Sequence, residues 1–97
     1  MKIYDFDGRK NISGERIREA RIKARLSQGA LAARVQLEGI VIERDSISRI
    51  EIGTRFIPDY EIPAFAHALG VSALWLLGIE QPRRNVPPGL YFFLIIL

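Results

Sequence analysis

Signals that begin and end helices recur at short intervals along the middle of this chain, so only short helices can form there. A serine or aspartate before a helix accepts hydrogen bonds from the free amides of its first turn, and a glycine after it adopts the positive φ that ends the helix. Five segments with helical apolar spacing lie between such signals. The sequence therefore predicts an all-α fold, a compact five-helix bundle. The predicted N-caps are Ser13, Ser27, Asp59 and Ser72, and the predicted stops are Gly53, Gly70 and Gly78.

The predicted helices cover residues 14–25, 28–35, 44–52, 60–69 and 73–77. The fourth has the strongest periodicity, with apolar side chains at i, i+3, i+4 and i+7. The third carries apolar residues on one face and polar residues on the other. The side chains expected to face the core are Ile17, Ala20, Ala24, Ile22 and Leu26 in the first helix, Leu31 and Val35 in the second, Ile47 and Ile50 in the third, Ile62, Phe65, Ala66 and Leu69 in the fourth, and Leu74, Trp75 and Leu77 in the fifth.

Two places interrupt this pattern. Residues 36–43 are interpreted as a connection in which Gly39 has positive φ, and one or two of the β-branched side chains at 40–42 are expected to enter the core. In the fourth helix, an N-cap at Asp59 would make Pro63 crowd the Asp59 carbonyl. Two alternatives stay open: the first turn is distorted, or the helix begins near Pro63.

The chain divides into an N-terminal arm (residues 1–12), a helical domain (residues 13–78) and a linker with an apolar C-terminal tail (residues 79–97). The tail ends with eight apolar residues, Leu90–Leu97, more than a soluble monomer normally exposes. Three interpretations are open: the segment docks on its own domain, it pairs with a second copy, or it is a disordered, adhesive end. We favour a contact role, and expect a homodimer with Leu90–Leu97 as the candidate contact.

Positive charge is confined to the front half of the chain. Residues 1–55 carry 12 basic and 8 acidic side chains, whereas residues 56–97 carry 2 basic and 3 acidic ones. This asymmetry favours a polyanionic partner, although a solvated basic helix explains it too. No apolar run approaches the ~20 residues that cross a bilayer and no secretory leader is recognisable, so we expect no membrane association.

The chemistry of most enzyme classes is missing from the sequence. There is no cysteine and His67 is the single histidine, which excludes thiolate and multi-histidine metal sites. No phosphate-cradling glycine loop and no nucleophile elbow occurs. We therefore expect no enzymatic activity, no cofactor and no metal. The absence of cysteine also fits the reducing cytoplasm, where we expect the protein to be.

Several short motifs follow one another in a fixed order between residues 13 and 78. They are Arg16-Ile-Arg-Glu-Ala-Arg-Ile-Lys-Ala-Arg-Leu-Ser-Gln28, Leu31-Ala32, Ser46-Ile-Ser-Arg-Ile-Glu51, Gly53, Ala66-His-Ala-Leu-Gly-Val71 and Leu76-Leu77-Gly78. In this order they resemble the lambda-repressor/Cro-like helix-turn-helix family, also called the xenobiotic-response-element family. The resemblance implies a lambda-repressor-like DNA-binding domain in a transcriptional regulator, most simply a repressor that blocks polymerase by occupying an operator.

The resemblance also implies which residues contact double-stranded DNA. The helix at 44–52 would be the recognition helix in the major groove, where arginine is well suited to bidentate contact with guanine. Gln28 would lie near DNA at the start of the preceding helix, and the loop after the recognition helix would approach phosphates. The implied DNA-binding residues are Gln28, Arg44, Asp45, Ser46, Ser48, Arg49, Thr54 and Arg55.

Glu51 calls for a separate interpretation because it lies on the inward edge of the predicted recognition helix. A carboxylate there is costly to bury without a partner. The family pattern pairs it with Arg21 of the first helix. We expect a partly buried Arg21–Glu51 ion pair with a structural role.

A second function class uses the same bundle. A protein-interaction module, such as an antitoxin-like partner, would bind another protein through the bundle and the apolar tail. Salt distinguishes the two: DNA binding weakens steeply as salt rises, because bound phosphates release counterions, and apolar docking does not.

Overall fold

A computed structural model describes residues 6–79 and contains the five predicted helices. They are α1 (Gly14–Lys23), α2 (Gln28–Gln36), α3 (Arg44–Ile52), α4 (Ile62–Leu69) and α5 (Ala73–Leu76), with a single 3₁₀ turn at Asp59–Glu61 before α4. No strand occurs in residues 6–79, so the predicted helical architecture is confirmed there. None of the helices in this range is long and apolar enough to span a membrane. Predictions about residues 1–5, the linker and the tail at 80–97 lie outside the described residues.

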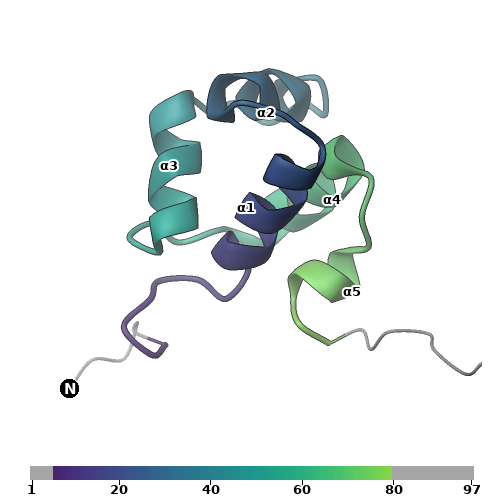
Figure 1. The fold of residues 1–97 in the computed structure, drawn as a ribbon. Coiled ribbons are helices and arrows are strands. Elements are labelled where there is room, and N and C mark those ends of the chain that lie inside the picture. Colours follow the sequence, from purple (N-terminus) through teal and green to yellow (C-terminus); the bar gives the residue numbers. More distant parts are fainter. Residues whose placement is uncertain (1–5, 80–97) are drawn as a thin grey trace, which may run out of the picture.

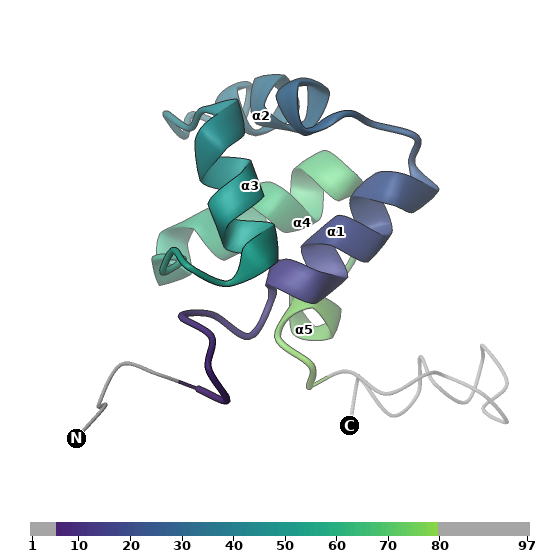
Figure 2. The ribbon, with the colours of Figure 1, turned by 60° about the vertical axis from the view of Figure 1, so that its left-hand side comes forward.

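The helices pack around one core, with α2 and α3 forming one end of the bundle and α5 the other. Figure 1 shows α3 along one side, α2 across the top, and α1 and α4 between them and α5; Figure 2 shows the same order after a turn. The largest fully buried side chains come from every helix and from the α2–α3 connection: Phe65, Ile17, Leu31, Ile42, Ile47, Ile50, Leu76 and Val35. The core thus fixes which face of α3 is left for solvent.

Most predicted helix ends are present. Ser27 Oγ accepts a hydrogen bond from the Ala30 amide at 3.0 Å, and Ser72 Oγ accepts from the Leu74 amide at 3.1 Å. The predicted stops at 53, 70 and 78 all have positive φ, as does Gly39. In the connection, Ile42 enters the core at 2% exposure while Val41 remains 93% exposed.

The predicted cap at Ser13 is wrong. Ser13 has helical dihedrals and its side chain makes no capping hydrogen bond. Instead, Asn11 Oδ1 accepts from the Gly14 amide at 2.7 Å. Ser13 Oγ is fully buried without a hydrogen-bond partner in residues 6–79. The cap therefore lies two residues before the predicted position, in the segment interpreted as an arm.

Asp59 does not cap α4 either. The structure adopts the second alternative: α4 begins at Ile62, which places Pro63 in its first turn, where its missing amide proton is not needed. Residues 59–61 form a separate 3₁₀ turn with no side-chain cap.

The apolar faces of α1 and α5 differ from the prediction. Ile17 and Ala20 are buried, whereas Ile22 lies on the outer side of α1 and Ala24 follows its end at Lys23, and both are exposed. In α5, Leu76 is fully buried and Leu74 is 51% exposed. Because α5 makes only about one turn, a small rotation about its axis decides whether Leu74 or Leu76 faces the core.

Because Asn11 rather than Ser13 caps α1, alanine substitutions at these two positions should have opposite effects on the free energy of unfolding. Ser13→Ala removes a buried hydroxyl that has no partner, so the free energy of unfolding should stay unchanged or rise by about 1 kcal/mol. Asn11→Ala deprives one amide and two carbonyls of a partner and should lower it by about 2–3 kcal/mol. Urea denaturation followed by circular dichroism measures both. A loss of about 1 kcal/mol for Ser13→Ala, as expected of an N-cap, would contradict this assignment.

Candidate nucleic-acid interface

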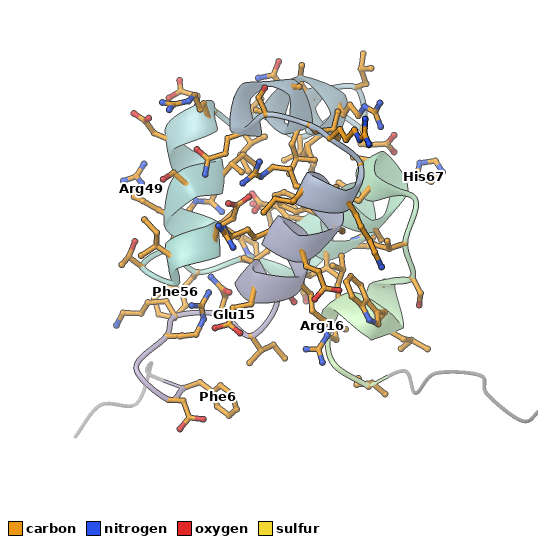
Figure 3. All side chains as sticks on the ribbon, in the orientation of Figure 1. Phe6, Glu15, Arg16, Arg49, Phe56 and His67 are labelled. Carbon is orange, nitrogen blue, oxygen red and sulfur yellow. The ribbon has the colours of Figure 1, made fainter. Side chains whose placement is uncertain are left out.

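The solvent face of α3 carries most of the residues predicted to contact DNA. Arg44 and Asp45 have side-chain exposures of 69% and 78%, and Arg49 is exposed on the same side. Ser46 and Ser48 are half-buried at its edges. Figure 3 shows Arg49 extending from α3 away from the bundle. Because α3 buries Ile47 and Ile50 fully on its other face, Arg49 points outward by helical periodicity. Arg44 is exposed at the first residue of the helix.

The charged side chains of this face make only weak contacts within the protein. Arg44 Nη1 lies 3.7 Å from Asp45 Oδ1, and Arg49 Nε donates to the Asp45 backbone carbonyl at 3.4 Å. Exposed ion pairs of this kind contribute little to stability. Both guanidinium groups are therefore able to rearrange toward a ligand at low cost.

One buried carboxylate joins the first three helices. Glu51, on the inner edge of α3, has a 3% exposed side chain. Its Oε2 accepts from Arg21 Nε of α1 at 2.6 Å and its Oε1 accepts from Arg21 Nη2 at 3.0 Å. Gln28 of α2 donates to the same Oε1 at 3.1 Å. The expected Arg21–Glu51 pair is thus part of a larger cluster that fixes α3 against α1 and α2.

Arg21 is fully occupied by this cluster. Its Nη1 donates to the Leu26 carbonyl at 2.8 Å, so the same side chain also holds the turn between α1 and α2. The hydrogen bond to the Glu51 carboxylate raises the pKa of Arg21 above its ordinary value, burial opposes this, and the carboxylate charge adds to the increase. The guanidinium therefore remains protonated at every working pH.

Gln28 makes a contact within the protein that the resemblance did not imply. The resemblance implied a residue near DNA, but in the structure its side-chain amide is half-buried and donates to Glu51. An amide committed to a buried carboxylate holds the recognition helix in place. The hydrogen bond to Glu51 uses one of the two N–H donors of this amide and fixes the direction in which its remaining polar atoms point.

The C-terminal end of α3 is held by a segment whose role the sequence did not reveal. The Arg9 guanidinium donates to the carbonyls of Ile52 at 3.1 Å and Glu51 at 3.0 Å, and Asn11 Nδ2 donates to the Ile50 carbonyl at 3.0 Å. Carbonyls at a helix end lack partners within the helix, and a cation there also complements the helix dipole. Residues 9–11 thus cap α3 from outside, although they lie about 40 positions away in sequence.

Two glycines allow this close approach. A Cβ at Gly14 would lie 2.0 Å from the Ile50 carbonyl oxygen, so a larger residue would push α1 away from α3. Gly53 has φ of +98°, and a Cβ there would also meet the Arg9 guanidinium at 2.7 Å. The Gly53 and Thr54 amides donate to the carbonyls of Ile50 and Arg49, which completes a Schellman motif. In the sequence, only the helix-end signals and the positions of the glycines point to this contact between residues 9–11 and the end of α3.

The loop after α3 contains an ion pair that was not expected from the sequence. Arg55 was expected to approach phosphate, but its Nη1 and Nη2 donate to the two oxygens of Glu61 at 3.0 and 3.3 Å. Glu61 has only 5% side-chain exposure, so the pair neutralises a buried carboxylate at the start of α4. Thr54 remains exposed beside the end of α3, where its hydroxyl donates weakly to the Arg49 carbonyl at 3.5 Å.

Comparison with known families agrees with this geometry. A family model described as a helix-turn-helix domain matches residues 14–74, well over half of the chain. The matched range begins with α1 and contains α2, α3 and the Arg21–Glu51 pair. No curated protein matches the chain with significant similarity.

Removal of the Glu51 carboxylate tests the three-helix cluster. Glu51→Ala leaves the Arg21 guanidinium buried without its partner, and loss of one member of a buried pair typically costs ~3–5 kcal/mol. We expect a lowered free energy of unfolding of that order, measured by urea denaturation. Glu19→Ala, which removes an exposed carboxylate from α1, is the matched control and should change stability by less than about 0.5 kcal/mol. Equal effects of the two substitutions would show that the cluster does not hold the helices together.

Arg55→Ala should lower the stability of the fold, because Arg55 pairs with Glu61, rather than remove only a contact with DNA. The substitution leaves Glu61 buried without its cation, so we expect a loss of about 3 kcal/mol in the free energy of unfolding. Arg44→Ala removes the same charge from an exposed site and should leave stability within about 0.5 kcal/mol. If Arg55→Ala were as stable as Arg44→Ala, the ion pair with Glu61 would not be needed for folding. Arg55 would then again be a candidate for phosphate contact.

Proposed function

The chain belongs to the helix-turn-helix domain family, a family of DNA-binding domains, and on this premise we propose that it is a sequence-specific regulator of transcription. It inserts α3 into the major groove of double-stranded DNA, while α2 crosses the phosphate backbone. The proposed subtype is the lambda-repressor/Cro-like one. The proposed mode of action is repression by occupancy: bound at an operator, the domain blocks access of polymerase to the promoter.

One observation carries this proposal: α3 exposes Arg44 at its first residue and Arg49 on its outer face, and is held on its inner face and at its C-terminal end. Direct readout requires donors whose positions are fixed relative to the base edges, because each bidentate arginine–guanine contact contributes ~1–3 kcal/mol of discrimination only when its geometry is correct. The buried cluster at Glu51 and the Arg9 contacts supply this rigidity. The exposed guanidinium groups of Arg44 and Arg49 supply the donors.

Some of the predicted DNA-binding residues are assigned to contacts with base edges, and others to positioning α3 on the DNA. We assign base-edge contacts to Arg44 and Arg49, with Asp45 beside Arg49 and with Ser46 and Ser48 at the edges of the exposed face. Thr54 is assigned to a phosphate beside the end of α3, where it positions without specifying a sequence. Gln28 and Arg55 act indirectly, because both side chains are committed to buried carboxylates.

We also propose that the regulator binds as a homodimer. A single short recognition helix reads only a few base pairs, whereas two helices related by a two-fold axis read a palindromic operator whose half-sites lie one helical turn apart. A two-fold dimer uses the same surface on both copies. The antitoxin-like alternative remains the competing function, since it would use the same bundle without DNA.

Selection of bound sequences from a random DNA pool, followed by binding assays on the selected site, tests the function. We expect a palindromic consensus and tight binding whose logarithm falls linearly with the logarithm of salt concentration, because phosphate contacts release counterions. No enrichment of any sequence, together with no dependence on salt, would contradict DNA binding and favour the protein-interaction alternative.

Arg49→Ala should reduce the preference for the selected site over random DNA by about 5- to 150-fold, the range that ~1–3 kcal/mol of lost discrimination represents. Arg16→Ala is the matched control, because it removes an arginine of α1 whose guanidinium lies next to α5, 5.9 Å from the Trp75 ring. Figure 3 shows the two side chains on opposite sides of the bundle. We expect the control to keep its sequence preference. If both variants lost it equally, the solvent face of α3 would not be the reading surface.

A further inference from the structure

An apolar groove lies at the end of the bundle opposite α2, and nothing in the proposed function uses it. It encloses about 700 Å³ between the segment at residues 6–13, the loop at 56–63 and α5. Figure 1 shows the N-terminal segment and α5 together at this end of the molecule. A smaller hollow of about 400 Å³ shares Phe6, Ile12 and Leu77 with the groove. These three apolar side chains lie where the two hollows meet, next to Arg9 and Asn11, which line both.

The groove suits an uncharged, apolar occupant. Its walls include Ile57, Ile62 and Pro63, and its mouth is formed by Phe6 and Ile12, which are 62% and 44% exposed. The cations on its lining already have partners: the Arg9 guanidinium binds the carbonyls of α3, and Lys10 Nζ lies 5.4 Å from the Phe56 ring. The lining is mostly apolar and offers contact area for hydrophobic side chains, with Arg9, Lys10 and Asp59 as its charged residues.

The chain itself contains a segment of the matching chemistry. Residues 90–97 are eight consecutive apolar residues without a charged side chain. The described chain ends at Ile79, two residues after Leu77 in the groove wall. The ten residues at 80–89 span up to about 30 Å when extended, at ~3.3 Å per residue, so the apolar segment can reach the groove beside which the chain leaves the bundle. We propose that residues 90–97 bind in this groove of their own chain and cover Phe6, Ile12 and Leu77.

The same chain is favoured over a second copy, the contact expected from the sequence, because the connection is short; the proposed homodimer would then use another surface. A short linker gives its attached segment an effective concentration in the millimolar range at a site it can reach. A second copy at micromolar concentration competes poorly against this. The bound segment would also lie against Arg9 and Asn11, which line the groove and hold the end of α3. Docking would thus stabilise the segment that fixes the recognition helix.

Paired cysteines in the full-length chain test this inference, and the natural absence of cysteine removes background reactions. One cysteine replaces Phe93 in the apolar segment and the other replaces Ile12 at the mouth of the groove. Phe6→Cys with Phe93→Cys is a second groove pair, at a more exposed position that leaves the core untouched. Val41→Cys with Phe93→Cys is the control, because Val41 is a 93% exposed apolar residue in the α2–α3 connection. Circular dichroism verifies that each variant is folded.

A short thiol-specific cross-linker is then added at protein concentrations from about 1 to 100 µM, far below the effective concentration of a tethered segment. We expect cross-links within single chains at the two groove pairs, formed at least about tenfold faster than at the Val41 control and independent of protein concentration. Mass spectrometry of non-reduced protein separates cross-links within a chain from those between chains.

Cross-links at the groove that form between chains and increase with concentration would overturn the inference and assign the groove to a second copy. Equal rates at the groove and at Val41 would overturn it as well, since the segment would then have no preferred site. No DNA enters the experiment, so its outcome is independent of the proposed regulatory function.

Discussion

The buried carboxylate of Glu51 is the interaction on which the arrangement of the first three helices depends. A charge with 3% exposed side-chain area requires full compensation, and Arg21 and Gln28 provide it from α1 and α2. Each contact is short and directional, so the three helices can meet in only one relative orientation. Apolar packing around Ile17, Leu31 and Ile47 would tolerate small rotations that this hydrogen-bond geometry does not.

A second set of polar contacts fixes the C-terminal end of α3, close to Glu51. Its last carbonyls are satisfied by Arg9, Asn11 and the turn at Gly53, so no part of the helix end is left free to fray. The approach of α1 that brings Asn11 into reach depends on Gly14, where any Cβ would meet a backbone oxygen. The recognition helix is therefore held by ion-pair chemistry on one side and by capping at its end.

This division between a fixed inner face and an open outer face links the structure to the proposed function. A reading helix needs exposed donors on a rigid support. Arg44 and Arg49 have weak internal contacts, whereas Glu51, two residues after Arg49, is bound by Arg21 and Gln28. The Arg55–Glu61 pair extends the support into the loop that leads to α4. Arg21 and Arg55 are paired with the buried carboxylates of Glu51 and Glu61. Only part of the basic charge of residues 1–55 is therefore available to a polyanion.

The sequence by itself determined the five helices, the boundaries of α3, the caps at Ser27 and Ser72 and the identity of the Arg21–Glu51 pair. These features follow from local propensity, apolar spacing and a family pattern, all of which reside in short stretches of the chain. Only the tertiary structure decided that Asn11 rather than Ser13 caps α1, that Arg9 caps α3 and that Arg55 and Gln28 serve buried carboxylates. The physical reason is that a long polar side chain binds whichever unsatisfied group the fold brings within 3 Å, and local sequence does not encode which distant carbonyl or carboxylate that is.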